Sequence, residues 1–250
     1  WTLDNVGPLA RTAKDLGLIL DIISGYDNKC LDSRASPAPY DFSVLDLKNL
    51  SDLRIGYLRN LERYEVDNEV ISAYEIACKE LMNLGAEFEE IILPDFDFSQ
   101  ARKNGLLLVE SEAAIVHKND LIFRSQELSS ELVSFLKYGE NLSAKKLLFV
   151  KKNIKDSAKI FYEIFEKLDA IVLPTTPQTA FKFGKHYKNQ ADFTSLANLI
   201  KCPSVSVPMG MSKDGLPLGL QFLGNLWEDK KILSIASKYQ ENSESSFQLP

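Results

Sequence analysis

The sequence contains no pair of adjacent glycines, and its 250 residues include only two histidines and three cysteines. A phosphate-cradling loop needs closely spaced glycines, so this absence argues against nucleotide binding. Neither His117 nor His186 accompanies a Gly-x-Ser-x-Gly turn, and no histidines, cysteines and carboxylates cluster at a metal-ligand spacing. We therefore expect no metal and no cofactor, and we interpret both histidines as solvated surface residues.

The sequence also lacks the cysteine spacing of a disulfide framework and the long apolar run of a membrane-spanning helix. Cys30, Cys78 and Cys202 are odd in number and widely spaced, which is typical of a reducing compartment. No apolar run approaches the roughly 18 residues of a membrane-spanning helix, and no signal peptide is visible. We expect a cytoplasmic protein with no membrane partner. The chain begins at Trp1 without an initiator methionine, and we expect it to be a piece of something longer.

The charge balance bears on possible partners. The formal net charge is −6, which argues against direct nucleic-acid binding because neutralising phosphates requires a surplus of lysine and arginine. Lysines are dense between residues 145 and 159, and we interpret them as the solvated face of a helix. The apolar share of 45% and the charged share of 26% are those of an ordinary globular protein.

Hydrophobic periodicity predicts alternating helices and strands in the first part of the chain. A helix is expected over 12–24, capped by Thr12 and ended by Gly25, and a second helix follows Asp67 and ends before Gly85. Short strands are expected over 53–58 and 87–93, and residues 26–51 lack any period and are expected to form a loop. Residues 98–138 are mostly helical in pattern, with breaks expected at Gly105, Asp120 and Gly139.

The second part of the chain contains the longest predicted helix, over 143–168, followed by a buried strand over 170–173. Further strands are expected over 204–211 and 218–223, joined by a tight turn at Asp214 and Gly215. A last helix opens at Glu228. This alternation predicts an α/β fold with a mixed β-sheet flanked by helices, and we find no boundary between two independent domains.

Three segments carry a resemblance to a known family. They are Thr2-Leu3-Asp4-Asn5-Val6-Gly7-Pro8-Leu9-Ala10-Arg11-Thr12, the stretch from Leu168 to Pro177, and the stretch from Phe193 to Gly224. In this order and spacing they resemble the C-terminal half of the amidase signature family. The resemblance implies the C-terminal part of that fold, so that residues 1–250 form a single incomplete domain with a helical insert region over 94–168.

The resemblance also implies a chemistry whose residues this chain lacks. Family members hydrolyse carboxamides with a Ser–cis-Ser–Lys triad, in which a buried neutral lysine acts as the base through a second serine. Their serines lie in a Gly-Gly-Ser-Ser-Gly-Gly-type loop, and no such loop is present here. The pairs 129–130 and 245–246 are interpreted as surface serines, and Ser204 and Ser206 as hydroxyls on one sheet face. No catalytic residue is therefore assigned.

What the resemblance transfers to this chain is the lining of a substrate pocket. The matching positions are Thr175, Thr176, Pro177, Phe193, Thr194, Ala197 and Asn198. Thr194 has an equal alternative as a helix N-cap, and Asp192 is expected to sit at that helix start rather than to bind a polar substrate end. The family has a glycine where this chain has Lys201, so the turn that follows the helix is expected to differ.

Three functions remain open at this point. The leading hypothesis is the C-terminal portion of an amidase acting on a small-molecule amide, with the triad in a missing N-terminal part. A variant is the glutaminase subunit of a tRNA-dependent amidotransferase, although residues 110–120 lack the Asn-Leu-Ala-Arg-Tyr-Asp-Gly-like stretch of that branch. The third is a non-catalytic pseudoenzyme or assembly module. An exposed sheet edge also predicts self-association.

Overall fold

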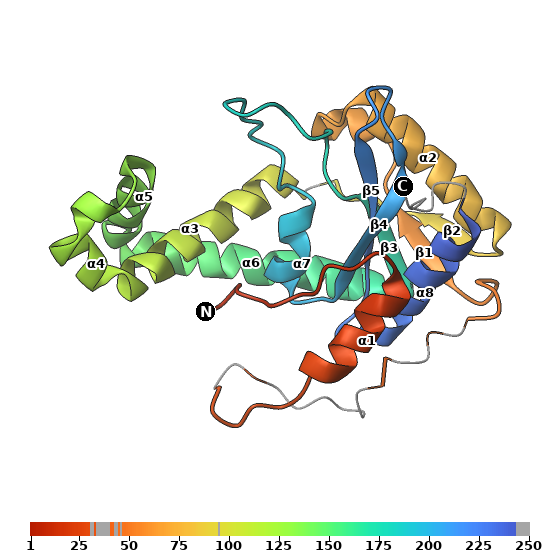
Figure 1. The fold of residues 1–250 in the computed structure, drawn as a ribbon, viewed down its shortest axis with the longest axis horizontal. Helices are drawn as coiled ribbons and strands as arrows, with labels where there is room; N and C mark the ends of the chain where they lie inside the picture. Colours follow the sequence, from red (N-terminus) through yellow and green to blue (C-terminus); the bar gives the residue numbers. More distant parts are fainter. Residues whose placement is uncertain (31–32, 34–40, 43–44, 46, 95, 244–250) are drawn as a thin grey trace.

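A five-stranded mixed sheet forms the centre of the molecule in the computed structural model, which describes residues 1–250 except 31–32, 34–40, 43–44, 46, 95 and 244–250 (Figure 1). The strands are β1 (Arg54–Tyr57), β2 (Glu87–Glu90), β3 (Ala170–Pro174), β4 (Ser204–Met211) and β5 (Pro217–Leu223), in the order β2-β1-β3-β5-β4. The first three are parallel, and β5 runs antiparallel to both of its neighbours. The predicted fold class is confirmed.

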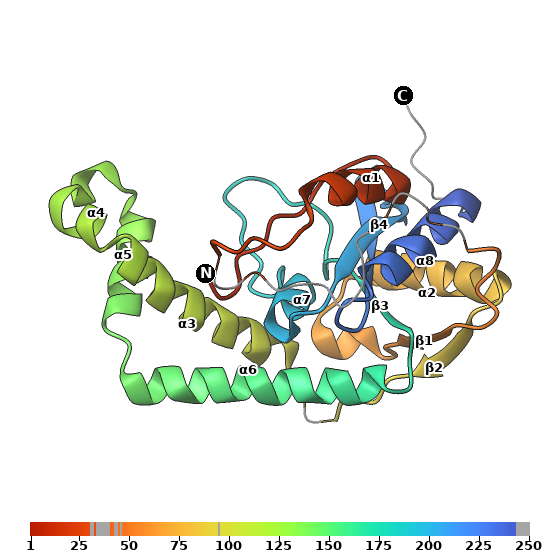
Figure 2. The ribbon, with the colours of Figure 1, turned by 90° about the horizontal axis from the view of Figure 1, so that it is seen from below.

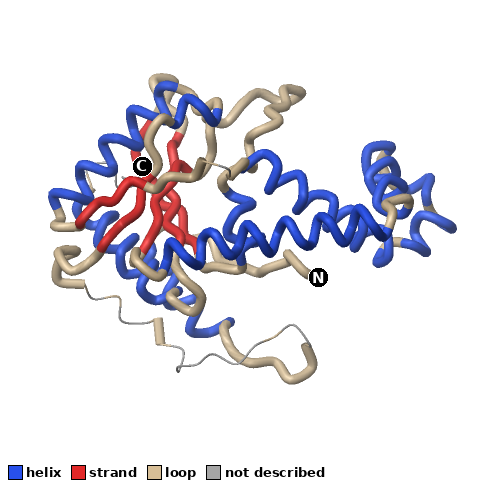
Figure 3. Tube along the Cα trace, turned by 180° about the vertical axis from the view of Figure 1, so that it is seen from behind, coloured by secondary structure: helices blue, strands red, loops and turns tan. Residues whose placement is uncertain are grey.

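Helices cover both faces of this sheet (Figures 1 and 3). Successive side chains of β5 point to opposite faces and contact different helices. The Phe222 ring lies 6.0 Å from the Tyr239 ring of α8 (Asp229–Asn242). Gln221 points to the opposite face, where its amide donates to the Phe193 carbonyl at the start of α7 (Thr194–Ile200). On the α8 side, α2 (Asn68–Asn83) also packs against the sheet, and α1 (Ala13–Ile23) packs on α8.

A helical arm projects from this body, as Figure 2 shows. It consists of α3 (Phe98–Val116), α4 (Lys118–Phe123), α5 (Ser130–Glu140) and the first half of α6 (Ala144–Phe165). Single 3-10 turns lie at Leu61–Tyr64 in the body and Ser125–Glu127 in the arm. Four buried apolar side chains of the arm lie outside the main core cluster: Leu108, Ala114, Leu136 and Val150. The arm thus buries these side chains apart from the main core.

Of the helix breaks expected at Gly105, Asp120 and Gly139, the first two are wrong and the third is confirmed. Gly105 lies inside α3 and Asp120 inside α4, and the first break comes at His117. The helix α5 ends at Glu140, one residue after Gly139, and α6 begins at Ala144. A Cβ at Gly139 would stand 2.0 Å from the Glu110 carbonyl oxygen, and one at Gly105 would stand 2.9 Å from the Leu199 side chain. Both glycines therefore allow close packing between helices. Sequence periodicity cannot distinguish a glycine at such a contact from one that ends a helix.

Most other expected elements are confirmed, with small differences at their ends. The strand expected over 87–93 ends at Glu90, and the helix expected over 12–24 covers Ala13–Ile23. Ile23, its last residue, is half exposed. The lysines of α6 are exposed as expected. Ser129 caps α5, whereas the pair 245–246 and part of the expected loop over 26–51 lie outside the described residues. None of the helices described is long and apolar enough to cross a membrane.

The turn after α7 has a left-handed residue at its first position. Lys201 adopts the left-handed conformation, with φ 58° and ψ 38°, and its N–H donates to the Ala197 and Asn198 carbonyls. This is the geometry that glycine adopts at a helix end. Lysine therefore adopts here, at a cost in strain, a conformation that glycine adopts freely, and a turn different from the family's stays a prediction.

Candidate functional site

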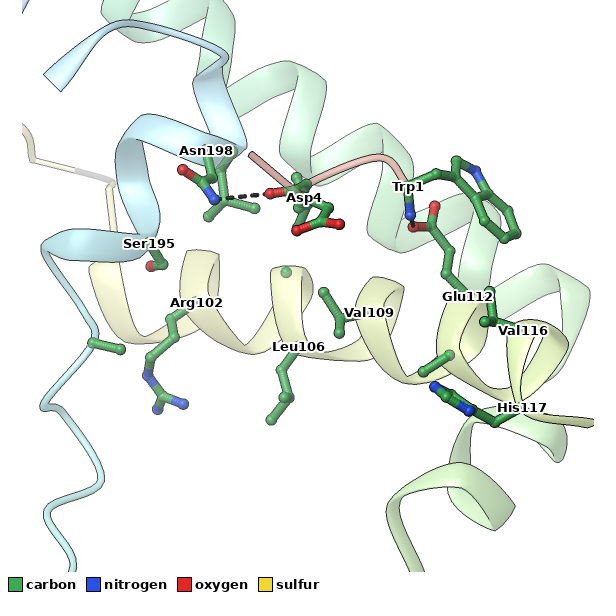
Figure 4. Close-up of a pocket in the computed structure, with 15 residues that line it drawn as sticks. Trp1, Asp4, Arg102, Leu106, Val109, Glu112, Val116, His117, Ser195 and Asn198 are labelled. Atoms are coloured by element: carbon green, nitrogen blue, oxygen red, sulfur yellow. Dashed lines mark hydrogen bonds and ion pairs between the residues drawn. The ribbon is translucent and has the colours of Figure 1, made fainter. Parts of the chain in front are cut away.

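A groove of about 550 Å³ runs along one face of α3 (Figure 4). Its floor is made by the α3 residues Arg102, Gly105, Leu106, Val109, Glu112, Ala113 and Val116, with His117 just beyond the helix end. These positions recur every three or four residues, so they form a single stripe about 22 Å long at 1.5 Å per residue. The N-terminal segment and α7 form the opposite walls, through Trp1, Leu3, Asp4, Ala191, Ser195, Asn198 and Leu199.

A partly buried ion pair lies at one end of the groove. Arg102 Nε lies 2.6 Å from Asp192 Oδ1, and the other carboxylate oxygen accepts the Ser99 hydroxyl. Asp192 is itself only 6% exposed. The pair ties α3 to the loop before α7, and it leaves this end of the groove nearly neutral. Asp192 does sit at the helix start as expected, but its partner is Arg102, which the sequence did not identify.

Glu112 lies near the other end of the groove and holds the N-terminal segment. Its carboxylate accepts the Thr2 amide N–H at 2.9 Å and the Thr2 hydroxyl. Burial would raise the pKa of Glu112, but these hydrogen bonds outweigh burial and hold the pKa below its ordinary value. The acid is therefore ionised and already partnered near neutral pH.

A hydrogen bond joins the two walls opposite α3. Asn198 Nδ2 of α7 donates to the Leu3 carbonyl oxygen at 2.9 Å, across 195 residues of sequence. Figure 4 shows this bond between Asn198 and the N-terminal segment beside Asp4, on the side of the groove opposite α3. Thus the first and the third of the segments that carry the resemblance meet at the groove.

The second such segment ends at a group of polar side chains beyond β3. Thr175 Oγ1 lies 2.6 Å from Ser206 Oγ on β4, and the Thr175 N–H donates to the Gly219 carbonyl on β5. Thr176 Oγ1 donates to the Gln178 carbonyl, while the buried Pro177 accepts from the Asp67 N–H through its carbonyl. Ser206 is exposed on one sheet face, as the alternation predicts.

The seven expected pocket residues are divided between these two places and the core. Asn198 lines the groove, and Thr175, Thr176 and Pro177 lie together at the end of β3. Phe193 and Ala197 are buried in the main core cluster beneath α7, and Thr194 is exposed. Thr194 is not the N-cap, because that position belongs to Phe193. A role in substrate binding stays a prediction for all seven.

The sequence pattern did not reveal the α3 side of the groove. The stripe from Arg102 to Val116 is visible as a three-to-four residue spacing, but the break expected at Gly105 divided it. His117 is exposed as expected, with its Nδ1 2.9 Å from Asp120 Oδ2, and it also borders the groove. Among the residues that the structure describes, no three histidines, cysteines or carboxylates are grouped to hold a metal ion.

Comparison with known proteins gives a consistent result. A family model described as "Amidase" matches residues 1–233. A glutamyl-tRNA(Gln) amidotransferase subunit of Thermodesulfovibrio yellowstonii is 30% identical over 97% of this chain and 55% of its own length, and that of a Synechococcus species is 28% identical over 97% and 52%. The chain therefore spans about half the length of these curated relatives.

Solved structures agree on the fold. The crystal structure of the corresponding glutamyl-tRNA(Gln) amidotransferase subunit from Thermotoga maritima matches with a TM-score of 0.82 and 26% identity, over all of this chain and 56% of that one. A bacterial aryl acylamidase of the amidase signature family matches with a TM-score of 0.83 at 20% identity, over 96% of this chain and 53% of that chain. At that identity the second match supports the fold alone.

Proposed function

Since the chain belongs to the amidase family, we propose that it forms the C-terminal portion of an amidase that hydrolyses a small-molecule carboxamide. Water adds across the C–N bond, and the products are a carboxylate and ammonia or an amine. The sequence has no Gly-Gly pair, so the Ser–cis-Ser–Lys triad would be supplied by residues outside these 250. The role of this chain is to complete the sheet and to wall the substrate site.

One observation carries this proposal. Asn198 on α7 donates to the Leu3 carbonyl at 2.9 Å beside a groove of about 550 Å³. Two family-like segments that are far apart in the sequence are therefore fixed to each other at a cavity of the size that small molecules occupy. We assign the polar group at Thr175 and Thr176 to the same substrate site, with the buried Phe193 and Ala197 anchoring α7 to the core.

The domain organisation follows from the same proposal. We interpret residues 1–250 as one incomplete domain, in which 94–168 is a helical insert that supplies the α3 wall of the groove. Burial raises the pKa of the Cys78 and Cys202 thiols to about 12 in each case, so both remain protonated and unreactive. Inert thiols are compatible with the cytoplasmic location that we propose.

A second candidate is the glutaminase subunit of a tRNA-dependent amidotransferase. It is favoured by the names of the relatives, which are 28–30% identical over nearly all of this chain. Against it, residues 110–120 lack the stretch associated with that branch. The two candidates differ in substrate, because a glutaminase releases ammonia from glutamine and transfers it within a complex.

The test is an ammonia-release assay on the protein purified from its source cells, with the intact mass measured on the same sample. Turnover of simple carboxamides, together with a serine-directed inactivator that labels a residue outside this chain, supports the amidase. Turnover of glutamine alone favours the glutaminase. No turnover of either substrate by a protein that includes the upstream half overturns both candidates in favour of a pseudoenzyme or assembly module. Sedimentation of that sample tests the expected self-association.

A further inference from the structure

The outer surface of α6 combines lysines with exposed apolar side chains. From Ala144 to Lys155 the helix contains five lysines and no acidic residue, and all five lysines are exposed. Among them Leu148 is 69% exposed and Phe149 is 56% exposed. We call this surface the lysine face of α6, and it consists of Lys145, Leu148, Phe149, Lys151, Lys152 and Lys155.

The lysine face is the side of α6 that turns away from the rest of the molecule. Lys145, Leu148, Lys152 and Lys155 recur at intervals of three or four residues, so their side chains form one stripe along the helix. Val150, on the other side, is buried, and α6 packs on α3 and α7. Figure 2 shows α6 along one side of the molecule, with no other labelled helix beyond it. The stripe is therefore open to solvent in the part of the chain that the structure describes.

The charge of the lysine face is only partly neutralised within the molecule. Lys152 pairs with Asp156, one turn further along α6, at 2.5 Å. Lys145, Lys151 and Lys155 form no ion pair with any residue that the structure describes. The chain as a whole has a formal net charge of −6, so this positive surface stands apart from the remainder of the molecule. Unpaired positive charges gathered on one face favour a negatively charged partner.

The residue types of the lysine face favour a lipid surface among anionic partners. Protein–protein interfaces are depleted in lysine and enriched in arginine, and α6 contains no arginine. Nucleic-acid bases stack on aromatic rings, and an exposed aliphatic side chain such as Leu148 adds nothing to that contact. Leucine and phenylalanine beside lysines on one helix are typical of helices that lie on anionic bilayers. Flexible lysine stems let the ammonium groups stay at the headgroups while the apolar side chains reach deeper.

We propose that the lysine face of α6 docks on a membrane surface that contains anionic lipids. The lysines lie at the level of the lipid phosphates, and Leu148 and Phe149 enter the boundary between headgroups and acyl chains. The expectation of no membrane partner was based on the lack of a spanning helix, which a peripheral contact does not require. Anionic lipids face the cytoplasm, so the contact agrees with the proposed location. It goes beyond the amidase function and does not depend on it.

The test is sedimentation of the natural protein that contains this chain with lipid vesicles. The vesicles consist of phosphatidylcholine alone, or of phosphatidylcholine mixed with an equal amount of phosphatidylserine. The protein is expected to sediment with the mixed vesicles only, and to do so less as salt is added, because salt screens the lysine charges. Equal sedimentation with both kinds of vesicle, or with neither, overturns the proposal.

A pair of lysine substitutions locates the contact. Lys151→Gln combined with Lys155→Gln should lower the partition coefficient on mixed vesicles about fivefold for each lysine, the equivalent of roughly 1 kcal/mol. The control combines Lys79→Gln with Lys213→Gln, which makes the same change in net charge at two exposed positions outside α6. The control should bind as the unaltered protein does. Equal losses in the two double variants would assign binding to net charge alone and overturn the proposal.

The apolar part of the contact has its own matched pair. Leu148→Ser should lower the partition coefficient by about tenfold, because the leucine side chain loses its burial in the bilayer. Ile76→Ser makes a similar change on α2, at a position that is 54% exposed, and should leave binding unchanged. Far-UV circular dichroism checks that both variants keep the helical content of the unaltered protein. No difference between the two variants overturns the insertion of Leu148.

Two further measurements distinguish a lipid surface from other anionic partners. In Phe149→Trp, the added tryptophan should shift its emission to the blue on mixed vesicles and not in inorganic phosphate. A shift of the same size in phosphate alone would replace the bilayer by a free anion and overturn the proposal. Binding of a double-stranded DNA oligonucleotide that is lost in the Lys151 and Lys155 double variant, without binding of vesicles, would overturn it in favour of nucleic acid.

Discussion

The sheet body and the helical arm are held together by different kinds of contact. In the body, side chains from strands and helices form one continuous apolar cluster, and β3 is buried along its whole length. In the arm, only a few apolar side chains are buried, and polar ones such as Asn104, Glu110 and Ser111 are buried beside them. The close approach of α3 and α5 depends instead on Gly139.

Because of this difference, we expect the body and the arm to contribute differently to the stability and to the shape of the molecule. Removing one side chain from an extensive apolar cluster lowers the free energy of unfolding. The backbone geometry changes little, because the strands remain paired. A helix pair in close contact depends on small residues, and one added methyl group changes the distance between the helices. The body is therefore expected to supply most of the free energy of unfolding. The arm sets the position of the α3 wall of the groove.

The largest expected effect is on the body. Phe222→Ala removes a fully buried ring that packs against Tyr239, and we expect it to lower the free energy of unfolding by about 3–5 kcal/mol. The measurement is the denaturant midpoint followed by far-UV circular dichroism. Leu148→Ala, at a position 69% exposed on the arm, is the control and should change stability by less than about 0.5 kcal/mol. Equal effects of the two would contradict a dominant body core.

The next effect concerns the arm alone. Gly139→Ala sets a Cβ 2.0 Å from the Glu110 carbonyl oxygen, so α5 must move away from α3 at a cost of about 1–3 kcal/mol. Amide hydrogen exchange should quicken in α3 and α5 while the strands keep their protection. Gly7→Ala is the matched control, since nothing lies within 4 Å of its added Cβ. Faster exchange in the strands as well would show that arm and body unfold as one unit.

The same contrast explains how far the sequence could predict the structure. Strands such as 204–211 and the helix after Asp67 were recovered because apolar periodicity records burial in the body core. In the arm, Gly105 was interpreted as a break, because a glycine that permits helix contact resembles one that ends a helix. The α3 side of the groove was therefore not predicted, since the break expected at Gly105 divided its stripe. The Arg102–Asp192 pair could not be predicted, because it joins residues 90 apart.

A smaller effect on the arm should depend on pH. Glu110 is buried between α3 and α5, its Oε2 accepts no hydrogen bond from the residues described, and burial raises its pKa above the ordinary value of 4.5. The folded arm therefore favours the protonated acid. Its contribution is fully present below the ordinary pKa and is lost as pH rises through the raised one.

Hydrogen-exchange protection of α3 and α5, corrected for intrinsic rates, should accordingly decline as pH rises above 4.5. Glu110→Gln should remove this decline and increase protection at neutral pH. The glutamine amide is neutral at every pH, so no charge has to be buried in the folded arm. The exposed Glu140→Gln change, at the end of α5, is the comparison and should leave the decline in place. A pH profile unaffected by Glu110→Gln would assign the dependence to another group.

The smallest effect has the opposite sign and lies where body and groove meet. Lys201 holds φ 58° at the end of α7, a conformation that costs an L-residue roughly 1–2 kcal/mol, whereas glycine adopts it freely. Part of the gain from Lys201→Gly is lost to the greater freedom of the unfolded chain, so we expect the free energy of unfolding to rise by about 0.5 kcal/mol. Lys159→Gly on the exposed face of α6 should instead lower it by roughly 1 kcal/mol. Opposite signs in thermal denaturation would establish that the turn after Asn198 is held under strain at Lys201.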